Sequence, residues 1–125
     1  MKFATETDIE KLKGTATGQG TCADSSAMLF CMDKLIVCCK NAMKEQDDPT
    51  AHASIVATRL NRREIKDAKE NCCIILSEKP CPMCVTGIFQ AKIKNLYYME
   101  NNTVKYMDFN MKNINDWVES IPIKK

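Results

Sequence analysis

Residues 80–84 have the sequence Pro80-Cys81-Pro82-Met83-Cys84, the most informative stretch of this chain. The apolar run at 72–77 just before it predicts a short buried strand. Pro82 suits the first turn of a helix, which we expect over residues 82–92. Cys81 and Cys84 are three residues apart, so both sulfurs lie on one side of that first turn. The positive helix end favours thiolate, the form that binds metals.

A single C-x-x-C pair has several interpretations: a redox pair, half of a zinc ribbon, or part of another metal site. A thioredoxin-type redox pair is expected after the first strand of the fold, but this pair follows the third. A zinc ribbon needs a second C-x-x-C pair, and the sequence contains none. The spacing therefore favours a metal site that recruits a ligand from elsewhere in the chain.

The one histidine of the chain, His52, lies at the start of the helical pattern at 51–70. Two helix N-termini that flank one strand can converge at the edge of a sheet, which would bring His52 to Cys81 and Cys84. Three nitrogen and sulfur ligands leave the fourth tetrahedral position to water, as in catalytic zinc sites. The sequence predicts Zn²⁺ as the cofactor, held by His52, Cys81 and Cys84.

The remaining pattern predicts an α/β fold. Strands are expected at 27–32, 35–40, 72–77 and 96–99, with helices at 5–13, 51–70, 82–92 and 113–120. The core order is thus β-β-α-β-α-β with a helix at each end, which predicts a three-layer α/β/α sandwich over a mixed central sheet. We expect a single domain over 1–125, in which residues 1–20 are weakly anchored.

Composition is that of an ordinary globular protein. The chain has 125 residues, 45% of them hydrophobic and 27% charged, with a net charge of +2. So balanced a charge gives no argument for nucleic acid or membrane binding. The N-terminus turns acidic before an apolar stretch forms, so we expect a cytoplasmic protein. In that compartment the eight cysteines are expected to be buried apolar residues, with a minority acting as metal ligands.

His52-Ala53 followed by Pro80-Cys81-Pro82-Met83-Cys84 resembles the cytidine deaminase-like superfamily of zinc-dependent base and nucleoside deaminases. The branch of guanine deaminases and tRNA adenosine deaminases is the most similar. The segment 48–53 resembles that branch's entry into its first zinc helix, and 83–91 resembles its second. The resemblance covers residues 27–99. It implies the fold of these enzymes, their zinc ion and, as substrate, a nucleobase or nucleoside.

The same resemblance implies roles for further residues. Asn41 lies at the spacing of the asparagine that contacts the base, and Ala53 and Ala27 correspond to residues near the base pocket. Members of this branch usually form dimers, so a homodimer is expected. After residue 99 the resemblance ends, and 100–125 is shorter than the basic helix of the tRNA-editing relatives. Nucleic acid binding is therefore not expected.

The family pattern breaks at Ser54. Family members carry His-Ala-Glu, whereas this chain carries His52-Ala53-Ser54. The family's glutamate takes a proton from the zinc-bound water and passes it to the base. A serine hydroxyl titrates far above neutral pH and cannot do this. Loss of a general acid–base group costs about 10²–10⁴-fold in rate, so the sequence predicts a zinc-binding member that is inactive or strongly impaired.

Alternatives remain open from the sequence. Another carboxylate, Glu78 or Asp108, could compensate for the missing glutamate in an active base deaminase, although the spacing favours neither. Position 54 could carry a deliberate inactivating substitution. The third alternative is a zinc-stabilised, non-catalytic domain that binds a ligand or partner.

Overall fold

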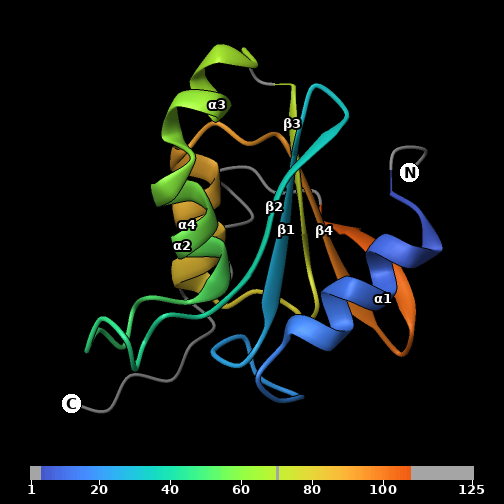
Figure 1. Ribbon diagram of the computed structural model, residues 1–125, viewed down its shortest axis with the longest axis vertical. Coiled ribbons are helices and arrows are strands. Elements are labelled where there is room, and N and C mark those ends of the chain that lie inside the picture. The colour runs from blue at the N-terminus through green and yellow to red at the C-terminus, as the bar shows by residue number, and fades with distance from the viewer. Residues whose placement is uncertain (1–3, 70, 108–125) are drawn as a thin grey trace.

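The structure, a computed structural model, describes residues 4–69 and 71–107 (Figure 1). Its elements in chain order are α1 (Glu6–Thr15), β1 (Ser26–Cys31), β2 (Lys34–Lys40), α2 (Ala53–Leu60), α3 (Arg62–Asp67), β3 (Cys72–Leu76), α4 (Pro82–Gln90), β4 (Asn95–Glu100) and β5 (Thr103–Met107). The helix expected at 113–120 lies outside the described residues.

The five strands form one mixed sheet in the order β2-β1-β3-β4-β5. Strands β3 and β4 are parallel, with α4 as the crossover between them, and the other neighbouring pairs are antiparallel. Helices α2 and α4 cover one face of the sheet and α1 covers the other (Figure 1). The α/β fold with a mixed central sheet, predicted from the sequence, is confirmed.

Both faces of the two central strands are buried, which explains their continuous apolar sequence. In β1, Leu29 points into the cluster beneath α2 and α4, and Met28 points into the cluster that contains Leu12 of α1. In β3, Cys72 and Cys73 divide between these two clusters in the same way. The cysteine pairs therefore alternate across the sheet as neighbouring strand residues must.

Helix α1 is closed by a capping box at its start, where Thr5 Oγ1 accepts from the Asp8 amide and the Asp8 carboxylate accepts from the Thr5 amide. Its anchor is Leu12, which is fully buried. Burial of one such side chain stabilises by about 1.5–3 kcal/mol. The carbonyl of Leu12 also accepts a hydrogen bond from Ser26 Oγ at the start of β1. Helix α1 thus lies against the sheet directly beside the loop that follows it.

The single helix expected at 51–70 is interrupted and forms α2 and α3. Asn61 lies between them with φ −121° and ψ 32°, outside the helical region. Its side-chain amide donates to the Ala57 carbonyl over 2.9 Å. The side chain thereby replaces a backbone partner, which is how asparagine competes with helix formation.

Two hairpin turns differ from the expectation. The first turn is centred on Met32 and Asp33, with φ of 54° and 64°, one residue earlier than the sequence predicts. The second, at Asn101 and Asn102, has φ of 51° and 62° and leads into β5, a strand that the pattern did not predict. Left-handed φ at both central residues is the geometry of the tight type I′ hairpin turn.

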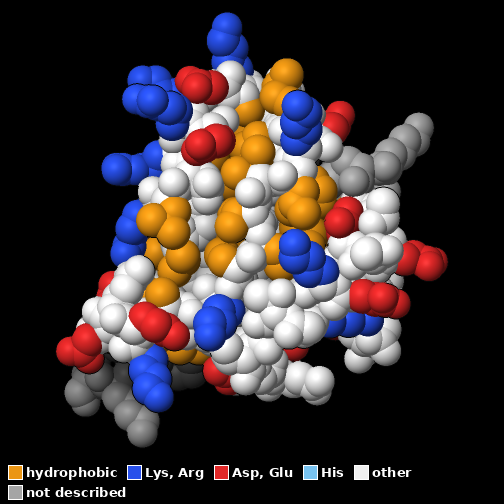
Figure 2. Space-filling model, viewed as in Figure 1, with side chains coloured by type: hydrophobic (Ala, Val, Ile, Leu, Met, Phe, Trp, Pro, Cys, Tyr) orange, Lys and Arg blue, Asp and Glu red, His pale blue; other side chains and the backbone are white. Residues whose placement is uncertain are grey.

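Hydrophobic side chains are visible over the middle of the face seen in Figure 1, with Lys and Arg side chains gathered at its upper left, towards α3 (Figure 2). Across the described ranges 4–69 and 71–107, we find no helix with the length and apolar character that crossing a membrane requires.

Candidate metal centre

Two helix N-termini face one another beside β3. His52 is the N-cap residue of α2, and Cys81 is the N-cap residue of α4. Both have extended backbone angles, and their carbonyls accept the first helical bonds, from Val56 and Val85. Neither side chain caps its own helix. The imidazole and the thiol are therefore both free to face the space between the helices.

The turn before α2 fixes the position of His52. The Asp48 carboxylate accepts hydrogen bonds from the Thr50 amide at 2.9 Å and from its hydroxyl at 2.7 Å. These bonds lower the pKa of Asp48, and Arg59 lies 3.9 Å from the same carboxylate. The Ala51 carbonyl also accepts from the Ala42 amide at 2.9 Å. The polar stretch before α2 is thus an ordered turn that leads into the site.

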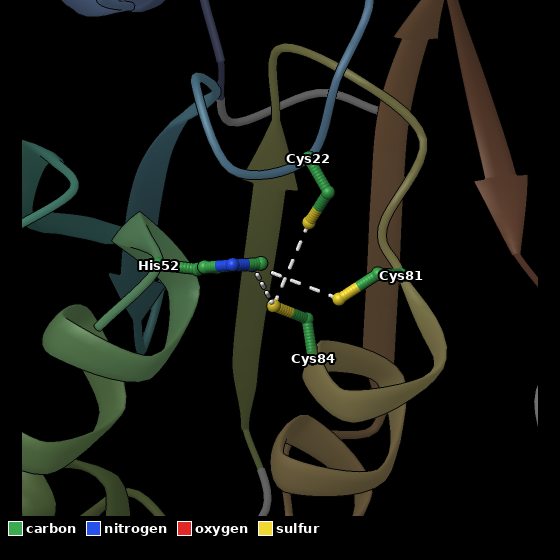
Figure 3. A group of neighbouring side chains, drawn as sticks. All are labelled: Cys22, His52, Cys81 and Cys84. Carbon is green, nitrogen blue, oxygen red and sulfur yellow. Dashed lines mark hydrogen bonds between the residues drawn. The ribbon is translucent and has the colours of Figure 1, made fainter. Parts of the chain in front are cut away.

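Four potential ligand atoms converge, one from each of Cys22, His52, Cys81 and Cys84, all within 4.8 Å of one another (Figure 3). His52 Nδ1 lies 3.3 Å from Cys84 Sγ and 3.6 Å from Cys81 Sγ. Cys22 Sγ lies 3.5 Å from Cys84 Sγ. His52, Cys81 and Cys84, the three ligands expected from the sequence, therefore lie together.

This group fits zinc both in its chemistry and in its dimensions. Zn–S bonds of about 2.3 Å and Zn–N bonds of about 2.0 Å place tetrahedral ligand atoms about 3.5–3.8 Å apart. Three of the separations, 3.3, 3.5 and 3.6 Å, are close to those edges, and all of the separations among the four atoms are within 4.8 Å. Three thiols and one imidazole are ligands that zinc prefers over harder cations.

The thiols also interact strongly with one another. Hydrogen bonds, first from Cys22, lower the pKa of Cys81 to about 2. The pKa of Cys84 is raised, mainly by its contact with Cys22, and that of Cys22 is raised, mainly by Cys81. The thiols thus oppose one another's ionisation in the absence of a metal ion. A divalent cation would allow all of them to ionise, because it compensates the repulsion between thiolates.

Cys22 was not predicted as a ligand. It comes from the loop between α1 and β1, residues 16–25, which we call the Cys22 loop. The sequence shows this segment only as a glycine- and threonine-rich connector, and Cys22 is 30 positions before His52, with no ligand spacing that links the two. The high cysteine count was the one available signal.

Ser54 occupies the second position of α2, two residues after His52, and its hydroxyl lies close enough to Cys84 to offset part of the rise that Cys22 causes in the pKa of that thiol. It is 1% exposed, and its Oγ is buried without a hydrogen bond of ordinary geometry among the described residues. The four-residue ligand group contains no carboxylate among the described residues. Glu78 lines a surface pocket of about 380 Å³ together with Gly18 and Gln19, and that lining contains none of the four ligand residues. Asp108 lies outside the described residues.

The residues expected to bind the base lie in different surroundings. Ala27 and Ala53 are fully buried in the core beneath α2 and α4. Asn41 is 9% exposed, and its amide is already engaged. Asn41 Nδ2 donates to Thr17 Oγ1 at 3.0 Å, and Asn41 Oδ1 accepts from the Met43 amide at 3.3 Å. Its partner Thr17 belongs to the Cys22 loop.

Two known proteins are similar to this chain in sequence. The chain is 36% identical to a tRNA-specific adenosine deaminase of Buchnera aphidicola over 73 residues, which are 58% of this chain and 48% of the relative. It is 32% identical to a guanine deaminase of Bacillus subtilis over 65 residues, 51% of this chain and 42% of the relative. The chain thus matches about half the length of these curated relatives.

Solved structures agree on the fold. A structure of guanine deaminase from Bacillus subtilis superposes with a TM-score of 0.56 at 20% identity, covering 93% of this chain and 97% of that one. A structure from a study of A-to-I editing by tRNA deaminases at the wobble position gives a TM-score of 0.52 at 28% identity, covering 60% and 58%. The sequence model of one protein family, described as the cytidine and deoxycytidylate deaminase zinc-binding region, matches residues 10–100 of this chain. This chain belongs to that zinc-binding deaminase family.

Proposed function

We propose that this chain is a zinc-binding member of the base deaminase family that does not turn over a base at a normal rate. The observation that carries the proposal is Ser54, a buried hydroxyl beside Cys84 at the position where the resemblance places a glutamate. His52, Cys81 and Cys84 are the proposed zinc ligands, since their ligand atoms lie within 4.8 Å of one another.

The zinc ion of such a site acidifies a bound water towards a pKa of about 7. Deamination then needs a group that removes the proton from this water and delivers it to the ring nitrogen and the leaving amine. Ser54 cannot carry that proton, because a serine hydroxyl neither ionises near neutral pH nor extends as far as a carboxylate. Glu78, the described carboxylate that the sequence offers as a replacement, lines a surface pocket whose lining contains none of the four ligand residues. The expected loss is at the upper end of the ~10²–10⁴-fold that a general acid–base group contributes, or beyond it.

The ligand class that we propose is a nucleobase or nucleoside of the guanine, adenine or cytosine type. The support is the family and the named activities of its relatives, one a guanine deaminase and the other a tRNA-specific adenosine deaminase. Because one relative is named for its action on tRNA, RNA belongs among the compounds to be tested even though the net charge of +2 gives no separate argument for it. We also propose a homodimer, which light scattering of the purified chain would test.

The test measures ammonia release by the zinc-loaded chain with guanine, adenine, cytosine, their nucleosides and a tRNA. An active guanine deaminase serves as the assay control. The Cys84→Ala variant, which lacks one proposed ligand, shows how much release depends on the metal. We expect release at the level of that variant. Ammonia release by the chain within ~10-fold of the guanine deaminase control, on any of these compounds, would overturn the proposal.

A further inference from the structure

The cluster contains a fourth potential ligand atom, one more than the three protein ligands that a catalytic zinc site uses. Catalytic zinc keeps three protein ligands and one water, whereas structural zinc has four protein ligands. Here Cys22 Sγ is 3.5 Å from Cys84 Sγ, about one tetrahedral edge away, and points into the same space as the other three (Figure 3). A zinc ion held by all four side chains has no vacant position for water.

The backbone of the Cys22 loop holds this sulfur in place. The carbonyl of Cys22 accepts two hydrogen bonds from Ser25, from its amide at 3.1 Å and from its hydroxyl at 2.6 Å. Ser25 is 1% exposed, so these bonds are shielded from water. They fix the peptide of Cys22 next to the first residues of β1. The backbone from which the sulfur projects is therefore held by hydrogen bonds within the loop, next to the point where β1 begins.

Asp24 closes the loop on itself. Its carbonyl accepts from the Thr17 amide at 2.9 Å, and its carboxylate accepts from the Thr21 hydroxyl at 3.0 Å. Gly20 has φ +90°, which lets the chain reverse direction between these contacts. A Cβ on Gly18 would lie 3.1 Å from the Asp24 side chain, so the loop packs closely around Asp24. The Cys22 loop is thus an ordered unit with its own hydrogen bonds.

The same loop also engages Asn41. Thr17 Oγ1 accepts from the Asn41 amide at 3.0 Å, and the Met43 amide occupies the Asn41 carbonyl oxygen. These two bonds use one of the two N–H donors and one of the two acceptor positions of the Asn41 amide. One loop therefore contributes Cys22 to the ligand group and Thr17 to the surroundings of the amide expected to contact the base.

We propose that Cys22 is the fourth zinc ligand, so that the Cys22 loop closes the site against water and base and the zinc serves a structural role. The proposal rests on the proposed ligation by His52, Cys81 and Cys84. It deepens the proposed function, because it gives a second barrier to turnover that does not depend on Ser54. It also predicts that the loop and both helix N-termini are joined through the metal.

The experiment is zinc X-ray absorption on the purified, zinc-loaded chain in solution, which counts sulfur and lighter ligands from their distances of about 2.3 and 2.0 Å. Three samples are compared: the natural sequence, Cys22→Ser, and Cys38→Ser. Cys38 is the matched control, because it is also a partly buried free cysteine but lies in β2, outside the ligand group. We expect three sulfurs and one nitrogen in the natural sequence and in Cys38→Ser. In Cys22→Ser we expect two sulfurs and two lighter ligands.

Two sulfurs and two lighter ligands in the natural sequence would overturn the proposal. That spectrum is decisive even if Cys22→Ser does not fold. The result is also separable from the test of the proposed function. If the zinc has two sulfur ligands and no ammonia is released, then Cys22 is not a ligand, and the proposed lack of turnover is unaffected. Ammonia release at a normal rate would instead overturn the proposed function. The ligand count would still decide, by itself, whether Cys22 binds the zinc.

Discussion

Gly87 of α4 lies directly against Ile55 of α2, so closely that a Cβ on Gly87 would be 2.8 Å from Ile55 Cδ1. These two helices carry His52, Cys81 and Cys84 at their N-termini. The packing of the Ile55 side chain on Gly87 is thus one of the contacts that hold the two helices beside each other. Gly87 costs about 1 kcal/mol in helix propensity relative to alanine, and the packing it permits is the structural reason for its presence.

Replacement of Gly87 by a large residue is expected to force the two helices apart. Gly87→Leu should lower the free energy of unfolding by about 1–3 kcal/mol through overpacking, and it should weaken zinc retention. The double variant Gly87→Leu/Ile55→Ala should recover a substantial part of the lost stability and of the lost zinc retention, since it shortens the side chain with which the new leucine would overlap. Urea unfolding and chelator competition measure the two effects. A Gly87→Leu chain as stable as the natural one would contradict the close packing.

Removal of zinc should destabilise the whole domain. The ligands come from the Cys22 loop, α2 and α4, and the metal-free cluster brings three thiols together. Zinc at about 1,000 times its dissociation constant contributes about 4 kcal/mol of stability. We expect a chelator to lower the thermal midpoint by about 10 °C or more, and stoichiometric zinc to restore it. A midpoint unchanged by chelation would contradict zinc binding at this site.

Restoration of turnover should require two changes, because our two proposals give two separate barriers. Ser54→Glu alone should remain at background, since Cys22 still occupies the fourth position. Cys22→Ser alone should also remain at background, since the proton carrier is absent. The double variant should exceed either by at least ~10²-fold in ammonia release.

Circular dichroism and zinc content must first show that all three chains are folded and loaded. Full activity in Ser54→Glu alone would show that water reaches the metal in the presence of Cys22.

Two buried thiols outside the metal site should make the domain sensitive to alkali. Burial raises the pKa of Cys31 to about 12 and that of Cys73 to about 12, from an ordinary value of 9.0. The folded state therefore holds these protons in a range where the unfolded chain loses them. Stability should fall as the pH rises from about 9 towards 12.

The variant Cys31→Ala removes one of these groups and should flatten that part of the profile, although it is less stable at neutral pH. The measurement is the urea midpoint at several alkaline pH values. A midpoint independent of pH above 9 would contradict the account of these two thiols.

Much of the fold was predictable because its buried strands and its crossover helix leave clear marks in the sequence. The apolar runs of β1 and β3 and the N-terminal Pro82 of α4 mark a buried sheet and its crossover helix. The interruption at Asn61 was not predictable, since it depends on a side-chain bond to Ala57 within an otherwise helical pattern. Strand β5 was missed because its two-residue turn at Asn101 and Asn102 uses left-handed residues other than glycine.

The candidate site was predictable where its residues are close in sequence or chemically distinctive. Cys81 and Cys84 share one helical turn, and His52 is the one histidine of the chain. Cys22 was not predictable, because it is placed by the folding of its loop, in which Ser25 bonds to Cys22 and Asp24 bonds to Thr17. The spacing of residues along the sequence does not reveal these contacts. Ligands supplied by loops depend on tertiary structure, whereas ligands on one helix depend on local periodicity.

The most direct measurement of the central claim is a crystal structure of the zinc-loaded chain with data collected at the zinc absorption edge. The account predicts one anomalous peak, about 2.3 Å from the sulfurs of Cys22, Cys81 and Cys84 and about 2.0 Å from Nδ1 of His52. A zinc ion that binds water in its fourth position, with the sulfur of Cys22 outside bonding distance, would contradict it.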